Sequence, residues 1–281
     1  MMINGLAFPN PDFGYETTIK LPFYYSRLGN GKTTVRDEGR QYDSYAAKCS
    51  CVMPRSSMDE FHALYDESGR GGRLTLSECR TSGFYPFTPA ALSVDGLEED
   101  AYSVTLSNIN QKGAVDLLAK GFRVDFEMLL GFDEGVVQSA AQPARPEGSM
   151  SMSAVTINGG VAIDGIRYPV SGFAPSVGYN VYSRHMLGGG VETINYDYHR
   201  GGKEPKSAGM TITATEAAAN GIIQALLFNI RANKFTITAP DGYHLFGRGT
   251  GEFDVRLNSA ELKVKHTRFD EFEIILNVVE A

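Results

Sequence analysis

Three cysteines are the first residues whose type and spacing could carry chemistry. Cys49 and Cys51 form a C-x-C pair, and Cys79 follows them in the chain. A closed zinc site needs four ligands, usually from two C-x-x-C-type pairs. In a strand, residues at this spacing share one face, and free cysteine is commonly a core residue. We therefore interpret the pair as small buried side chains and expect no metal site.

Two glycine-containing stretches resemble phosphate-binding loops but depart from their spacing. Residues 28–34, LGNGKTT, end like a P-loop, yet Ser26 stands where that motif needs its first glycine. Gly247, Gly249 and Gly251 lack the G-x-G-x-x-G spacing and precede an expected strand instead of a helix. We interpret residues 28–34 as a hairpin turn and expect no cofactor.

The remaining titratable residues form no recognisable catalytic set. No histidine pair has H-x-x-x-H or H-E-x-x-H spacing, and no serine is framed as G-x-S-x-G. The acidic clusters at residues 66–67 and 98–100 lack a calcium-binding loop, so we interpret them as solvated edges. The expected function is therefore not enzymatic. The histidines, each expected at the surface or satisfied by neighbours, are His62, His185, His199, His244 and His266.

Composition indicates a soluble globular protein. Of the 281 residues, 42% are hydrophobic and 21% are charged, and the net charge is −7. That charge argues against a surface that binds nucleic-acid backbones, which relies on clustered Lys and Arg. No apolar window is long enough to span a membrane, and the first residues do not have the pattern of a secretory signal. We expect folding in a cytoplasm, which an odd, small number of cysteines also favours.

The sequence contains an internal repeat. Residues 49–76 and 210–237 align without a gap, and each runs from an alternating strand through a helix and a turn to a strand containing threonine. Upstream, Tyr-Ser-Arg recurs at residues 25–27 and 182–184, and downstream residues 125–130 match 271–276. A Gly-rich turn follows each Tyr-Ser-Arg, and these four matches in one order indicate a duplicated domain. Two unrelated α+β domains with similar strand chemistry remain the alternative.

The elements of each repeat follow from hydrophobic periodicity. The first helix is expected to begin at Ser56 or Ser57 with capping-box spacing and to stop at Gly69, and the second is capped by Thr215. The apolar stripe of the first helix is Met58, Phe61, Leu64 and Tyr65, and that of the second helix is Ala219, Ile222, Ile223 and Leu226. Alternation with period two predicts strands around residues 102–106, 124–130, 253–257 and 272–278.

These patterns predict a mainly β chain with one flanking helix per repeat. Each repeat is expected to form an antiparallel sandwich or a partly closed barrel. Residues 138–152 are small, polar and proline-containing, as in a linker. The expected organisation is an N-terminal arm at residues 1–17, a first domain at 18–137, this linker, and a second domain at 153–281.

This order of elements resembles tailed-bacteriophage tail proteins with the tail-tube fold, a group that contains tube proteins, distal tail proteins and baseplate hubs. The resemblance implies two tandem tube-like domains in a structural subunit near the distal end or baseplate. It also implies assembly in the host cytoplasm into the virion tail. The residues that carry it are the units at 49–76 and 210–237, the hairpins at 25–43 and 182–198, and the closing strands at 124–130 and 272–279.

The resemblance also implies partners and contact residues. The expected partners are copies of the chain itself in a ring, preferably a trimer with a hexamer as the alternative, and other tail and baseplate proteins. DNA would pass through the lumen without specific binding, and no membrane is involved. In this family the long hairpin reaches the neighbouring ring. The candidate contact residues are therefore Tyr25, Arg27, Asn30, Lys32, Arg36, Arg40, Tyr182, Arg184, His185, Tyr196 and Tyr198.

A carbohydrate-binding β-sandwich that attaches to a host is the alternative from another functional class. Such modules need an exposed aromatic platform. The chain has no tryptophan, and its dense aromatic cluster outside the expected strands is Phe84, Tyr85 and Phe87. A hydrolase is the third hypothesis, and no motif supports it.

Overall fold

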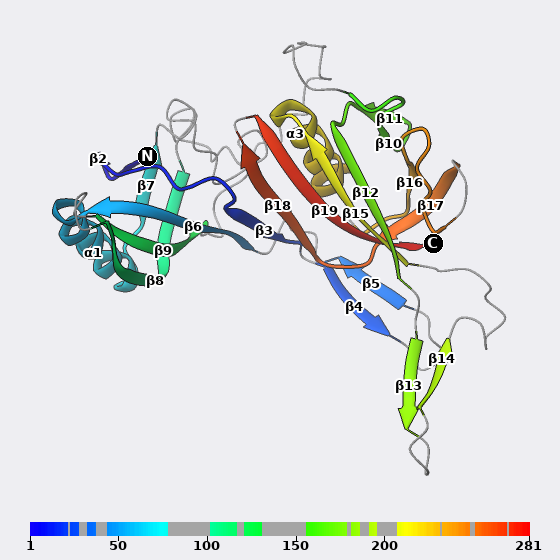
Figure 1. Cartoon of the computed structure of the whole chain (residues 1–281), viewed down its shortest axis with the longest axis horizontal. Helices are drawn as coiled ribbons and strands as arrows, with labels where there is room; N and C mark the ends of the chain where they lie inside the picture. The colour runs from blue at the N-terminus through cyan, green and yellow to red at the C-terminus, as the bar shows by residue number, and fades with distance from the viewer. Residues whose placement is uncertain are drawn as a thin grey trace.

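A computed structural model describes residues 1–21, 23–27, 33–37, 44–77, 102–116, 121–130, 156–178, 181–185, 191–195, 207–230, 232–247, 251–268 and 270–281. These residues are mainly β (Figure 1), which confirms the class expected from the alternating side chains. Every described strand pair is antiparallel. In this part of the chain, no helix is long and apolar enough to cross a membrane.

The two halves of the chain contain their described elements in the same order. The first half comprises β1 (Met2–Ile3), β2 (Leu6–Ala7), β3 (Glu16–Lys20), β4 (Phe23–Arg27), β5 (Thr33–Asp37), β6 (Ser44–Pro54), α1 (Arg55–Gly69), β7 (Leu74–Ser77), β8 (Tyr102–Asp116) and β9 (Gly121–Leu130). The second half comprises β10 (Val161–Ile163), β11 (Ile166–Tyr168), β12 (Gly172–Gly178), β13 (Val181–His185), β14 (Val191–Asn195), β15 (Ser207–Ala214), α3 (Glu216–Gln224), the π-helical η2 (Ala225–Ile230), β16 (Phe235–Thr238), β17 (Glu252–Leu257), β18 (Glu261–Arg268) and β19 (Glu271–Glu280).

One sheet of fifteen strands unites both halves (Figure 1). Its order is β11-β10-β16-β17-β19-β18-β3-β6-β9-β8-β7-β1-β2, and β15 lies between β12 and β19. Strands β17 and β18 follow one another along the same edge of β19. The two halves meet at β3, which pairs with β18 on one edge and with β6 on the other. We call the β3–β18 pairing the joint.

The order of strand pairing repeats between the halves. A short hairpin, β1–β2 or β10–β11, pairs with β7 or β16, which then pairs with β8 or β17. The last strand of each half, β9 or β19, lies between that strand and β6 or β15. Strands β3 and β12 complete the series on the far side of β6 and β15. Each element of the first half thus has a counterpart in the second.

The turns of the two short hairpins repeat the same hydrogen bonds. Asn4 and Asp164 both have a φ of 49°, and glycine with positive φ follows each. The Asn4 side-chain oxygen accepts the Thr75 N–H at 2.7 Å, and the Asp164 carboxylate accepts the Thr236 N–H at 2.8 Å. Asn and Asp tolerate the left-handed conformation because their short side chains bond locally. The repeat therefore extends to the first residues of the chain.

Three sequence expectations need correction. Residues 1–17, expected as an arm, contain β1 and β2, and β1 pairs with β7. Helix α1 begins at Arg55 after Pro54, without a side-chain cap, so the predicted capping box is wrong. The match of residues 125–130 with 271–276 is wrong by four positions, because Cys49 faces Phe126 whereas its counterpart Met210 faces Leu276. A shift by an even number keeps apolar residues on the same face, so alternation could not reveal the error.

The core lies on the face of the sheet that the helices cover. A row of directly opposite, buried side chains crosses the joint and runs through both halves. Helix α1 packs on β6 and β8, and α3 packs on β15 and β19. Both predicted helical stripes face this core, with Tyr65 partly buried. The residues of the row, in order, are Met128, Ala47, Thr17, Val264, Ile274, Ile212 and Phe173.

Cys49 and Cys51 lie in this core, which confirms the interpretation of the pair as buried side chains. Removal from water raises the pKa of the Cys51 thiol to about 12, and nearby Asp12 adds to the effect. Cys51 therefore stays protonated at neutral pH. Cys79 and the expected linker at residues 138–152 lie outside the described residues.

Docking of α1 on the sheet can be tested at Phe61. Its side chain is fully buried, with ring centroids 5.2 Å from Phe126 and 5.4 Å from Phe8. We expect Phe61→Ala to lower the free energy of unfolding, measured with urea, by about 3–5 kcal/mol. The neighbouring His62 is exposed, so His62→Ala should change it by less than about 0.5 kcal/mol. Equal effects of the two changes would show that α1 does not pack on the sheet.

Candidate functional site

The face of the sheet opposite the helices is polar. In β6, Lys48 and Ser50 alternate with the buried cysteines, and in β9 Asp125 and Glu127 alternate with Phe126. Helix α1 lies on the Phe126 side, as its ring contact with Phe61 shows. Successive side chains of a strand point to opposite faces, so these polar residues face away from the helix. We call this surface the polar face.

Five charged residues of alternating sign form a row across the polar face. Lys265 lies opposite both Glu273 and Glu16, and Lys48 lies opposite both Glu16 and Glu127. Each lysine therefore stands between two glutamates. We call Glu273, Lys265, Glu16, Lys48 and Glu127 the charge row. It runs through β19, β18, β3, β6 and β9 and so crosses the joint.

The charge row supports the pairing of the two halves. Opposite charges on directly opposite residues contribute about 0.2–1 kcal/mol each relative to alanine pairs, and like charges there destabilise a sheet. Glu16 also makes an ion pair with Lys263 of β18 at 3.2 Å. In the row, Lys48 is exposed and the other four residues are half-buried, so each pair contributes modestly. Their number and alternation nevertheless favour one register of β3 over others.

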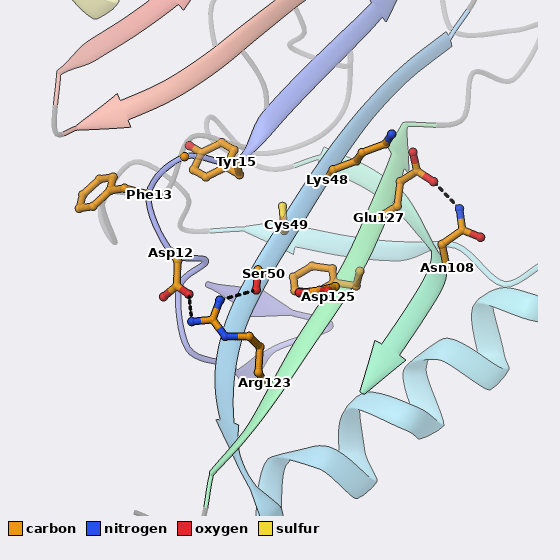
Figure 2. Close-up of a pocket in the computed structure, with 12 residues that line it drawn as sticks. Asp12, Phe13, Tyr15, Lys48, Cys49, Ser50, Asn108, Arg123, Asp125 and Glu127 are labelled. Atoms are coloured by element: carbon orange, nitrogen blue, oxygen red, sulfur yellow. Dashed lines mark hydrogen bonds and ion pairs between the residues drawn. The ribbon is translucent and has the colours of Figure 1, made fainter. Parts of the chain in front are cut away.

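An open depression of about 550 Å³ adjoins this row in the first half (Figure 2). At one end, Arg123 forms an ion pair with Asp12 at 3.1 Å and donates a hydrogen bond to Ser50 Oγ at 3.1 Å. At the other end, Asn108 donates a hydrogen bond to Glu127. Arg123 and Asp12 thus neutralise each other, and Glu127 is held by an amide, an arrangement that suits a structural surface.

Asp125, which also lines the depression, stays ionised. Hydrogen bonds from Lys112 and Ser50 hold the pKa of its carboxyl group below the usual value. Lys112 Nζ lies 2.5 Å from Asp125 Oδ2. A carboxyl group held in the charged form is a poor proton donor near neutral pH. General-acid catalysis by Asp125 therefore finds no support in this geometry.

An aromatic cluster around the buried His266 holds the joint on the helix-covered face, with Phe13 at its exposed side. His266 of β18 is 1% exposed, and its ring stacks on Phe272 with centroids 4.5 Å apart. Its Nδ1 lies 2.6 Å from the Tyr15 hydroxyl, and Phe13 meets the ring edge-on. Tyr15 immediately precedes β3, so this cluster connects the two strands of the joint. Burial lowers the pKa of His266 below its usual value.

The predicted contact residues that the structure describes lie on two separate two-stranded ribbons, β4–β5 and β13–β14 (Figure 1). Strand β4 pairs with β5, and β13 pairs with β14, which confirms that both segments form hairpins. The predicted contact residues whose backbone is described are Tyr25, Arg27, Arg36, Tyr182, Arg184 and His185. The side chain of Arg36 is exposed. Asn30, Lys32, Arg40, Tyr196 and Tyr198 lie outside the described residues, as do Phe84, Tyr85 and Phe87. The contact role of the hairpins stays a prediction.

Sequence reasoning missed the charge row and the joint. A signal for the joint was present, since Ile3, Gly5 and Pro9 recur as Ile163, Gly165 and Pro169 at a constant spacing. That match would have assigned β3 as the counterpart of β12. The row itself depends on cross-strand register, which no local pattern contains. Neither a scan of protein-family models nor a search of curated proteins found a match to this chain.

The lowered pKa of His266 predicts a pH dependence of stability. The unfolded chain binds this proton more tightly than the folded one, so stability is complete above the unfolded pKa of about 6.5 and falls as the pH drops below it. The limiting slope is about 1.4 kcal/mol per pH unit for one proton. Urea unfolding of wild type and His266→Gln between pH 8 and pH 5 should show this loss in the wild type alone. The exposed His62→Gln variant should follow the wild type, and parallel profiles for all three would contradict the assignment.

Proposed function

We propose that this chain is a structural component of a bacteriophage tail, in the distal-tail or baseplate-hub region. Two tandem tail-tube-like domains form part of a ring around the DNA channel, and the ring joins the tube to the tail tip. The observation that carries the proposal is the continuous antiparallel sheet. It crosses from one half of the chain to the other, with helices on one face and the charge row on the other.

This distribution of side chains suits a ring wall. A sheet that lines a water-filled channel needs one polar face, while its other face needs a cover that buries the apolar residues. Helices α1 and α3 supply the cover, and the polar face is the candidate channel lining. The hairpins β4–β5 and β13–β14 leave the sheet and are the candidate contacts to neighbouring rings (Figure 1). Three copies would place six repeats around the channel.

The charge row fits passage of DNA without retention. Binding to DNA releases counterions when lysine or arginine neutralises phosphates. Lys265 and Lys48 each have a glutamate directly opposite on both sides, so phosphates would compete with those carboxylates. Excess acidic charge in the chain, at −7 overall, works in the same direction.

The assembly state tests the proposal most directly. Mass measurement combined with negative-stain imaging of the purified protein, alone and with its tail partners, should show rings with a central opening. The preferred mass is three times the chain mass of 30.6 kDa. A monodisperse monomer that forms no ring or tube even with tail partners would count against the proposal. Binding of that monomer on a glycan array would favour the carbohydrate-binding alternative.

Neutralising the acids of the charge row should create affinity for DNA. The triple variant Glu16→Gln, Glu127→Gln and Glu273→Gln leaves Lys48 and Lys265 without their opposite carboxylates. We expect about a tenfold or greater gain in binding to a short duplex at low salt, with strong salt dependence. Fluorescence anisotropy of a labelled duplex measures the gain.

A matched triple variant on the helical side separates the charge row from net charge. Asp59→Asn, Glu60→Gln and Asp66→Asn alter exposed residues of α1 and remove the same number of charges. This variant should bind DNA no better than the wild type. Equal gains in both triple variants would mean that overall charge, and not the charge row, prevents binding.

A further inference from the structure

Two of the strand edges that lack a described strand partner, those of β12 and β8, occupy positions in the repeat that correspond to the joint. Strand β12 pairs with β15 on one edge, and no described strand lies on its other edge. Strand β8 pairs with β7 only at Tyr102–Val104, and the Leu106 N–H is bonded to the Ser68 hydroxyl of α1. Beyond Leu106, the outer edge of β8 has no strand partner among the described residues. Such edges offer unpaired N–H and C=O groups to another strand.

These two edges are the counterparts of the two strands in the joint. Glu16 of β3 lies opposite Lys48, and Ser176 of β12 lies opposite Gly209, the residue that corresponds to Lys48. Strand β12 is therefore the second-half equivalent of β3. In the same way, the part of β8 after its register shift runs along β9 as β18 runs along β19. The chain thus makes this contact once, between β3 and β18. Strand β12 resembles β3 and the later part of β8 resembles β18, and neither has such a partner among the described residues.

We propose that β12 of one copy pairs antiparallel with β8 of the next copy, in the register of the β3–β18 joint. The strand pairing is argued from the strand edges alone, and it rests on the proposed function only for the number of copies that close a ring. The pairing places Lys112 opposite Ser176 of the neighbouring copy and Asn110 opposite Gly178. Their counterparts within the chain are the pairs Lys265–Glu16 and Lys263–Thr18.

The side chains along both edges allow this approach. Asn108, Asn110, Gln111 and Lys112 are exposed, and Ser176 is exposed on β12. Small residues on β12 leave room for the longer polar side chains of β8. The exposed lysine also discourages indiscriminate edge pairing, a protection that natural edge strands use.

Proline in β12 is compatible with the pairing. Pro175 corresponds to Tyr15, and Tyr15 contributes its carbonyl oxygen to the joint by accepting the His266 N–H at 3.1 Å. A proline retains this carbonyl. Pro175 also lies within the β12–β15 ladder, opposite Met210, and proline inside a sheet is confined to edge strands whose missing N–H points outward. The outer edge of β12 therefore keeps the acceptor that the joint uses.

The interface joins two different edges, so it is heterologous. Interfaces of this kind close into rings when the rotation between copies permits and otherwise produce open filaments. The joint already relates one half of the chain to the other. If copies pair as the two halves do at the joint, the sheet continues from chain to chain. The polar face of every copy then lies on one side of the sheet, and the helix-covered face lies on the other.

Engineered disulfides test the register in the full-length protein. In a Cys79→Ser background, the double variant Lys112→Cys and Ser176→Cys should form covalent multimers under mild oxidation. These multimers should separate when reduced, as read by non-reducing gels and intact mass. Directly opposite residues of antiparallel strands have Cα separations within the range that a disulfide spans. The internal pair Glu16→Cys and Lys265→Cys should close within one chain and serves as the positive control.

Off-register and single variants sharpen the result. Lys112→Cys combined with Ala174→Cys shifts the pair by two residues along the same face and should give at least about tenfold less multimer. A mixture of the two single variants, Lys112→Cys and Ser176→Cys, should give covalent dimers, whereas each alone should give none. Equal yield from the shifted pair, or dimers from a single variant alone, would overturn the proposed pairing.

The outcomes also separate this pairing from the proposed function. Rings seen by negative stain, in which the Lys112→Cys and Ser176→Cys pair does not cross-link while the internal control closes, would overturn this pairing and leave the ring proposal standing. Covalent head-to-tail filaments without rings would support this pairing and count against the ring. A monomer that gives neither rings nor multimers would overturn both.

Discussion

The pairing of β3 on both of its edges is the constraint on which the rest of the structure depends. Thr17 and Ile19 must enter the core between the buried side chains of β6 and β18, so the other residues of β3 must face the polar side. A slip by one residue would bury Glu16 and expose Ile19, and burying an unpaired carboxylate is costly. Because β3 is held in one register, the sheets of both halves share one helix-covered face and one polar face.

The joint combines three interactions that act on different sides of the sheet. On the polar face, the alternating Glu and Lys of the charge row favour one register of β3 against β18. On the helix-covered face, His266 of β18 contacts Tyr15, next to the start of β3, and stacks on Phe272. Backbone hydrogen bonds between β3 and β18 complete it. The buried contacts contribute more than the exposed charges of the row, because apolar burial is not screened by water or salt. The alternating charges instead add specificity to the register.

Comparison of the two halves shows which features of a repeat unit can vary. The short hairpins retain the same turn conformation and the same bonds from Asn4 or Asp164, since a positive φ restricts the residues that fit. The strands of the joint diverge more. Glu16 and Lys265 carry opposite charges, whereas their counterparts Ser176 and Lys112 do not form such a pair. A contact between copies that lacks this charge pair would be weaker than the internal one.

The sequence by itself determined the mainly β class, the buried stripe of each helix, the buried cysteines and the existence of both hairpins. These follow from local periodicity and turn chemistry, which residues close in the chain specify. Only the tertiary structure decided that residues 1–17 contribute β1 and β2 to the sheet, that Phe126 corresponds to Leu276, and that Glu16 stands between Lys48 and Lys265. The physical reason is that strand register depends on residues far apart in the chain, and a period of two leaves every even shift equally acceptable to a local pattern.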